Sequence, residues 1–116
     1  MQQENNLRSR TKQFALRVIK LVDSLPRSRG ADVIGRQLVS SATSVGANYR
    51  SAQRGRSRAE FCSKLGIVEE ESDESTYWLE LIAESGMVAK ELLSDLIQES
   101  NEITAMVVAS IRTARD

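Results

Sequence analysis

Turn signals interrupt this 116-residue sequence at only three places, and four long segments lie between them. Pro26 and the four residues behind it form the first break, because proline removes a helical amide donor. Gly55 and Gly86 form the other two, since glycine reaches the positive φ that ends many helices. Residues that favour strands do not cluster between these breaks. The chain is therefore predicted to be all-α.

Apolar residues recur at helical spacing in all four segments. The second segment is the clearest, because its apolar residues alternate in steps of four and three: Leu38, Ala42, Val45, Tyr49 and Ala52. Short connections between long helices favour antiparallel neighbours, so we predict an up-down-up-down four-helix bundle. Its helices are expected at about 6–25, 32–54, 58–85 and 89–114, within a single domain of residues 1–116.

The composition excludes several classes of function. Histidine is absent, which removes the usual general base and the commonest transition-metal ligand. Cys62 is the only cysteine and has no partner for an internal disulfide, as is typical of a reducing cytoplasm. No apolar run approaches the length of a membrane span, and the first residues lack the features of a signal peptide. We expect a cytoplasmic protein with no enzyme activity, no metal, no cofactor and no membrane partner.

The charges are divided unequally between the two halves of the chain. The net charge is zero, with 16 basic and 16 acidic residues. Residues 1–58 contain 12 of the basic residues and 3 of the acidic ones, a balance of +9. Residues 59–116 carry the opposite balance of −9. The zero net charge is therefore the sum of a basic first half and an acidic second half, and the fold determines where these charges lie in space.

Four arginines lie among the nine residues from 50 to 58, at the predicted tip between the second and third helices. Gly55 ends one helix there, and Ser57 with Glu60 forms a capping box that begins the next. In an up-down bundle this tip shares one end with the start of the first helix and the finish of the last. The basic residues expected there, which we name the basic pole, are Arg8, Arg10, Lys12, Arg50, Arg54, Arg56, Arg58, Arg112 and Arg115.

The basic pole suits a polyanion such as RNA or DNA, because guanidinium groups bind phosphate and binding releases counterions. The helix dipole offers another explanation for the four residues in last turns, which are Arg50, Arg54, Arg112 and Arg115. Arg56 and Arg58 lack that explanation. Tyr49 belongs to the apolar stripe, so we expect recognition of backbone or shape rather than of bases. The candidate nucleic-acid contacts are Arg8, Arg10, Lys12, Arg50, Arg54, Arg56, Arg58 and Arg115.

The second helix carries small side chains beside its apolar stripe, including Ser40, Ser41, Thr43, Gly46 and Ala47. A face in contact with solvent normally carries Lys and Glu. A glycine inside a helix also costs about 1 kcal/mol relative to alanine. We therefore expect this face to make a second close contact, either inside the bundle or between subunits.

The third helix has five acidic residues between positions 69 and 74. Adjacent carboxylates repel one another, and this site is too far from the helix start for the dipole to compensate. Glu71 and Glu74 lie on the stripe that contains Trp78, so partial burial is expected. Carboxylate pairs hold two metals in some bundles, but those sites use Glu-x-x-His, and this chain has no histidine. We expect the acids to meet arginines or small hydroxyls on a neighbouring helix.

Several segments together resemble a known family. They are Gln37-Leu38, Ser-Val-Gly-Ala-Asn-Tyr-Arg at 44–50, Arg-Ser-Arg-Ala-Glu-Phe at 56–61, Asp73-Glu74 and Tyr-Trp-Leu-Glu-Leu at 77–81. The sequence resembles the bacterial four-helix bundle proteins, also called 23S rRNA intervening-sequence proteins. The resemblance implies an up-down bundle, a homopentameric ring and no established enzyme activity. Related proteins include the accessory subunit of diversity-generating retroelements, a basic pentamer that binds reverse transcriptase and nucleic acid, whereas this chain is neutral.

A ring requires two complementary surfaces on each subunit, because its contacts are heterologous. The small and basic surfaces of the first two helices are expected to face the acidic third or fourth helix of the next subunit. The candidate interface residues are Ser44, Asn48, Glu71 and Glu74.

Two functions follow from these expectations. The first is a non-catalytic, oligomeric RNA-binding or ribonucleoprotein accessory protein that uses the basic pole. The alternative is an oligomeric scaffold for protein–protein interaction with no affinity for nucleic acid, in which the arginines serve capping and subunit contacts. The expected partners are further copies of the chain, RNA or DNA, and a partner protein.

Overall fold

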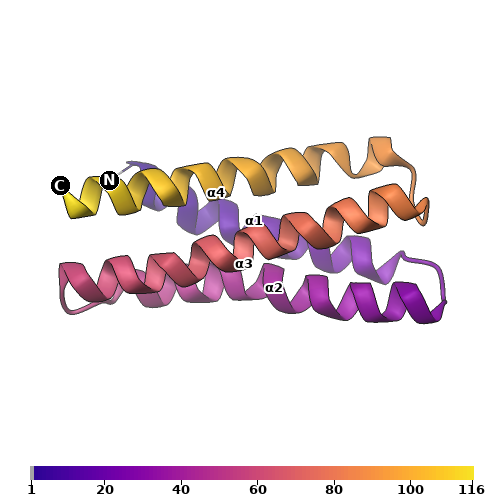
Figure 1. Cartoon of the computed structure of the whole chain (residues 1–116), viewed down its shortest axis with the longest axis horizontal. Helices are drawn as coiled ribbons and strands as arrows, with labels where there is room; N and C mark the ends of the chain where they lie inside the picture. The colour runs from indigo at the N-terminus through magenta and orange to yellow at the C-terminus, as the bar shows by residue number, and fades with distance from the viewer. Residues whose placement is uncertain (1) are drawn as a thin grey trace.

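The computed structural model describes residues 2–116, with side chains from residue 6 onward. The described residues form an all-α four-helix bundle that measures 45 × 22 × 18 Å (Figure 1). A short 3-10 helix, η1 (Lys90–Leu92), precedes the last helix. The four long helices are α1 (Gln2–Asp23), α2 (Arg29–Gln53), α3 (Arg58–Ser85) and α4 (Ser94–Arg115).

The connections between helices lie at the two ends of the bundle. Figure 1 shows the α2–α3 connection at the same end as the start of α1 and the finish of α4. The α1–α2 and α3–α4 connections lie at the opposite end. Helix α1 packs against α2 and α4, and α3 packs against the same two helices. The arrangement brings the parts of the chain that carry the basic pole to one end.

Three of the four long helices have a bound that differs from the expected one by more than one residue. Helix α2 begins three residues early, because the Ser28 hydroxyl caps it and accepts the Ala31 N–H at 3.1 Å. Helix α1 extends from Gln2 to Asp23 and so begins and ends earlier than expected. Helix α4 begins at Ser94 rather than near residue 89, since η1 occupies the residues before it. The bounds of α3 are the predicted ones.

The predicted apolar stripe of α2 is buried along its whole length. Leu38, Ala42 and Val45 are fully buried, and Tyr49 and Ala52 are 1% exposed. The other helices supply the remaining large core residues, among them Leu7, Phe14, Leu65, Leu79, Ile82, Ile103 and Val107. Burial of such side chains stabilises the fold by about 1.5–3 kcal/mol each, before the conformational entropy of the chain is counted.

Two glycines end helices in different ways. Gly86 adopts a φ of 78° and closes α3 in the left-handed conformation, as predicted. The prediction of a positive φ for Gly55 is wrong, because Gly86 is the only described residue with one. Gly55 is needed for space instead, since a Cβ there would lie 3.0 Å from the Ala52 carbonyl oxygen and 3.2 Å from the Phe61 nitrogen. Ser57 caps α3 as expected, and its hydroxyl accepts the N–H of the third helical residue at 3.0 Å.

The small face of α2 makes part of its predicted second contact inside the bundle. A Cβ at Gly46 would lie 3.4 Å from the Thr11 hydroxyl, so α1 approaches α2 closely at this point. Ser41 is 1% exposed and accepts a hydrogen bond from the Ser75 hydroxyl of α3 at 3.0 Å. Ala47, on the same helix, stays exposed. The bundle therefore covers only part of the small face.

A layer of buried hydroxyls joins α3 to α4 at mid-height. Ser72 and Thr104 share a hydrogen bond of 2.7 Å, and Thr76 and Ser100 share another of the same length. Ser72 also donates to the Ser100 carbonyl at 3.2 Å. Buried polar groups are costly unless paired, so these contacts favour one register between the two helices.

Candidate nucleic-acid interface

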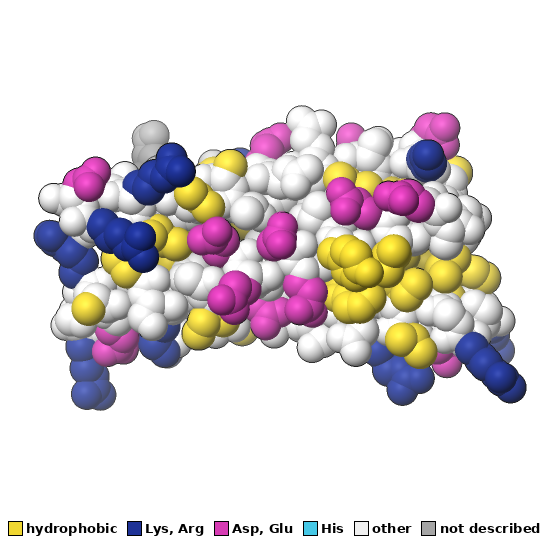
Figure 2. All heavy atoms as spheres, viewed as in Figure 1, with side chains coloured by type: hydrophobic (Ala, Val, Ile, Leu, Met, Phe, Trp, Pro, Cys, Tyr) yellow, Lys and Arg dark blue, Asp and Glu magenta, His cyan; other side chains and the backbone are white. Residues whose placement is uncertain are grey.

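The α2–α3 connection concentrates arginine at one end of the molecule. Arg50 lies in the last turn of α2, Arg54 is its C-cap residue, Arg56 lies in the connection and Arg58 begins α3. All four side chains are exposed. Figure 2 shows basic side chains at this left end, acidic ones across the middle of the visible face and further basic ones at the far right.

The first hollow at this end, which we name the tip groove, lies between the end of α2 and the start of α3. It has a volume of about 490 Å³. Four cations and one carboxylate line it, so its formal charge is +3. The charged residues are Arg50, Arg54, Arg56, Lys64 and Glu60.

Lys64 was not among the predicted contacts, because it lies in the acidic half of the sequence. Its Nζ donates to the Ser51 hydroxyl of α2 at 2.8 Å, and its side chain is half-buried. This hydrogen bond holds the ammonium in the groove. The spacing of Lys64 in the sequence could have predicted that it faces the helix tip, because it lies one helical turn beyond Glu60 and two turns beyond the capping Ser57.

The second hollow, which we name the flank groove, lies between α1 and α2. Its volume is about 340 Å³, and it is lined by Arg8, Lys12 and Arg50 with no carboxylate. Ala47 and Arg50 also line the tip groove, so the two hollows adjoin. We name their combined cations the basic surface: Arg8, Lys12, Arg50, Arg54, Arg56 and Lys64.

Arg10 differs from its predicted role. Its guanidinium donates to both carboxylate oxygens of Glu99, at 2.7 and 2.9 Å, and to Glu102 at 2.8 Å. These hydrogen bonds, those to Glu99 above all, raise the pKa of Arg10 above its ordinary range. The side chain is 24% exposed and fastens α1 to α4. Arg10 is therefore engaged inside the chain and does not belong to the basic surface.

The remaining predicted cations lie at the same end but outside the two grooves. Arg58 lines a separate hollow with Phe61 and Ala114. Arg115 is exposed in the last turn of α4, as is Arg112. They extend the positive end without lining the tip groove or the flank groove.

No aromatic side chain lines either groove of the basic surface. Tyr49 is 1% exposed and belongs to the core, as predicted. An aromatic pair, the exposed Tyr77 and the half-buried Trp78, lies further along α3 with ring centroids 5.0 Å apart. The basic surface therefore offers charge without a platform on which bases stack.

The acidic cluster of α3 has no cationic partner in the described part of the chain. The ion pairs there are those of Arg10 with Glu99 and Glu102 and one between residues 36 and 32, so the expected contacts of these acids with arginines are not made within the described residues. Glu71 is half-buried, and burial, followed by the nearby Glu74 and Glu70, raises the pKa of its carboxyl. The expectation of partial burial holds for Glu71, whereas Glu74 is exposed.

The four candidate interface residues are distributed over α2 and α3. Ser44 and Asn48 are half-buried on α2, where the Asn48 amide donates to the Ser44 carbonyl at 2.8 Å. Glu74 accepts a hydrogen bond from the Trp78 indole at 3.3 Å. Each of these contacts lies within one helix. A role in subunit contacts stays a prediction.

The described residues contain no group of three side chains that could hold a metal ion. Their helices are also too short or too polar to cross a membrane.

Comparisons with known proteins found a matching protein family and a similar solved structure. The family described as "23S rRNA-intervening sequence protein" matches residues 3–109. A protein with unknown function from the S23 ribosomal protein family of Bacteroides thetaiotaomicron VPI-5482, solved at 1.70 Å, is 32% identical. The alignment covers 95% of this chain and 98% of that one, with a TM-score of 0.88. The comparison with curated proteins gave no match.

Proposed function

Because the chain belongs to the 23S rRNA-intervening sequence protein family, we propose that it is a non-catalytic RNA-binding or ribonucleoprotein accessory protein of the cytoplasm. The observation that carries the proposal is the basic surface, in which two adjoining grooves gather six cations and one carboxylate. Phosphate groups are the natural ligands of such a surface, since guanidinium groups bind them with paired hydrogen bonds.

The grooves favour contact with the RNA backbone over contact with bases. Their cations come from α1, α2, α3 and the α2–α3 connection and are mostly exposed, so they can follow a chain of phosphates. Binding would release counterions from the RNA and weaken with salt. Without stacking aromatics, affinity depends little on base sequence.

Assembly with further copies of the chain supports the same function. The acidic cluster of α3 lacks cationic partners within the described residues, whereas the exposed part of α2 carries mostly small and basic side chains. These surfaces are complementary in charge, as a heterologous ring contact requires. A homopentamer would repeat the basic surface five times, and contacts through Ser44, Asn48, Glu71 and Glu74 would join its subunits. Sedimentation as a monomer at micromolar concentration would exclude this assembly.

The test of RNA binding reverses charge in the tip groove. Arg54→Glu combined with Arg56→Glu should lower affinity for a 20-nucleotide RNA by at least about tenfold at low salt, since each removes a phosphate contact and adds repulsion. Fluorescence anisotropy measures the affinity, and circular dichroism checks that the helices persist. Arg27→Glu with Arg29→Glu is the matched control, because it changes the same charges at the opposite end.

Equal losses in the tip and control variants would mean that RNA responds only to net charge. No measurable RNA binding by the wild-type protein would contradict the proposed function.

The aromatic pair on α3 favours a second candidate, an oligomeric scaffold for protein–protein interaction without affinity for nucleic acid. Tyr77 is 53% exposed beside the half-buried Trp78, and exposed aromatic side chains are enriched at protein interfaces. The scaffold predicts no RNA binding by the wild-type protein. It also predicts that the tip variant breaks the oligomer, which sedimentation would show.

A further inference from the structure

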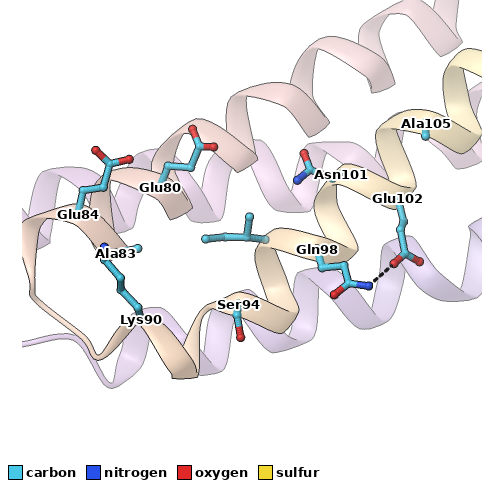
Figure 3. Close-up of a pocket in the computed structure, with 10 residues that line it drawn as sticks. Glu80, Ala83, Glu84, Lys90, Ser94, Gln98, Asn101, Glu102 and Ala105 are labelled. Atoms are coloured by element: carbon cyan, nitrogen blue, oxygen red, sulfur yellow. Dashed lines mark hydrogen bonds between the residues drawn. The ribbon is translucent and has the colours of Figure 1, made fainter.

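A third groove lies between α3 and α4, at the end of the bundle away from the basic surface (Figure 3). Its volume is about 630 Å³, the largest of the hollows described for this chain. On α4 its lining runs from Ser94 to Ala105. These twelve residues of helix, eleven rises of about 1.5 Å, span about 16 Å, so the groove has the length of about three helical turns.

The floor of this groove has apolar residues from both helices, with one amide, that of Asn101, between Ile97 and Ala105 on α4. Ala83 of α3 is 9% exposed, and Ile97 of α4 is half-buried beside it. Ala105 continues the lining along α4 with only a methyl group. Ala83 and Ala105 each present only a methyl group, so another helix can approach closely at these two positions. An apolar strip between two parallel ridges is the shape that receives a helix in helix-in-groove recognition.

The two walls differ in charge. Figure 3 shows Glu80 and Glu84 projecting from α3, and Gln98 and Glu102 from α4 on the other side. Glu80 and Glu84 are exposed, lie one turn apart and form no ion pair with any described side chain. Glu102 is already held by Arg10 at 2.8 Å and by the Gln98 amide at 3.0 Å. The free negative charge is therefore concentrated on the α3 wall.

We propose that this groove docks an amphipathic helix from a partner protein, with apolar residues on one face and Lys or Arg along one edge. The apolar face would lie on Ala83 and Ile97, and the basic edge would lie along Glu80 and Glu84. The complementarity of charge selects a basic occupant and fixes its orientation. Lys90, the only cation in the lining, stands beside the α3–α4 connection and disfavours a basic residue at that end.

This surface is separate from the basic surface. The charged walls begin near the α3–α4 connection, and the tip groove lies at the α2–α3 connection, at the opposite end of the bundle (Figure 1). The molecule could therefore hold RNA at one end and a basic helix at the other. Substitutions in the α3–α4 groove are expected to leave RNA affinity within about twofold of the wild type.

The experiment uses a fluorescein-labelled 14-residue peptide of Ala, Leu and Lys that places its leucines on one face and its lysines along one edge. Anisotropy with the full chain should show saturable binding, and a peptide with Glu in place of Lys should not bind. Glu80→Lys combined with Glu84→Lys should weaken binding by at least about tenfold. Ala105→Trp should do the same by filling the groove. Glu70→Lys with Asp73→Lys is the matched control, since it reverses two exposed acids of α3 outside the groove.

Three outcomes would overturn the proposal. Equal weakening by the control pair would mean that the peptide responds to overall charge. Equal binding of the acidic peptide would mean that the walls do not select the occupant. Dissociation of a wild-type oligomer by the groove substitutions would mean that a second copy of the chain covers the groove. Circular dichroism checks each variant, and Ala105→Trp, which keeps all charges, decides the question if charge reversal unfolds the bundle.

Discussion

Arg10 shows that the basic half of the sequence does not supply free charge at every position. Its guanidinium contacts two carboxylates of α4 and the Met106 sulfur at 3.2 Å. With Glu99 and Glu102 at hydrogen-bond distance, the local charge is negative rather than positive. Such paired groups attract phosphate weakly, since their donors are already used. A count of arginines at one end therefore overestimates the binding surface, and the partner of each side chain has to be known.

Glu71 is the carboxylate whose surroundings oppose its charge. Burial and the neighbouring Glu74 and Glu70 raise its pKa above the ordinary 4.5. Above the raised pKa the ionised Glu71 carboxylate therefore lowers the stability of the folded protein. Below pH 4.5 the group is protonated in both the folded and unfolded states and has no such effect. Glu71→Gln should raise the free energy of unfolding at pH 7 by less than about 1 kcal/mol, because solvent still screens the site.

Urea unfolding at a series of pH values measures this effect. The gain should shrink as the pH falls toward 4.5 and vanish below it. Glu84→Gln, on the exposed end of the same helix, is the control for the loss of one charge. A gain from Glu71→Gln that does not change with pH would contradict the assignment.

At the scale of the elements, the sequence predicted local structure best at residues with a single physical role, such as burial in the core or capping of a helix. The five-residue stripe of α2 is buried as its spacing required, and Ser57 caps α3. Ser28 was missed as a cap because it stands in a run of turn residues behind Pro26. The helix end at Gly55 was predicted correctly, but the predicted cause, a positive φ, was wrong. A sequence shows that a glycine lacks Cβ, but not which atoms a Cβ would contact.

The same substitution at two glycines should have opposite effects on stability. At Gly55 a Cβ would lie 3.0 Å from the Ala52 carbonyl oxygen, so backbone must move. Gly55→Ala should therefore lower the free energy of unfolding by about 1–3 kcal/mol, as overpacking does. At Gly66, inside α3, a Cβ would contact nothing within 4 Å. Gly66→Ala should therefore raise the free energy of unfolding by about 0.5–1 kcal/mol, because alanine has the higher helix propensity. Denaturant unfolding of both variants measures the difference, and a loss at Gly66 would contradict the open space there.

At the scale of the molecule, topology turns a charge split along the chain into a charge arrangement in space. Arg50, Arg54 and Arg56 could be identified from the sequence, but the joining of their groove to a second one depends on how α1 packs on α2. Packing also adds Lys64, from the acidic half of the sequence, to the basic surface, and it excludes Arg10, which pairs with Glu99. The α3–α4 groove had no sequence signal, because its floor consists of residues from two helices whose neighbours are set by the fold.

The salt dependence of RNA binding distinguishes the six cations of the basic surface from Arg10. If all six contact phosphate, a plot of log affinity against log salt for single-stranded RNA should have a slope of about −4. Arg54→Gln with Arg56→Gln should reduce the magnitude of this slope by about 1.4, because two phosphate contacts and their released counterions are lost. Arg10→Met should leave the slope unchanged, since its guanidinium is held by Glu99 and Glu102. A smaller slope for Arg10→Met, with helical structure intact by circular dichroism, would show that RNA draws Arg10 away from α4 and would return it to the binding surface.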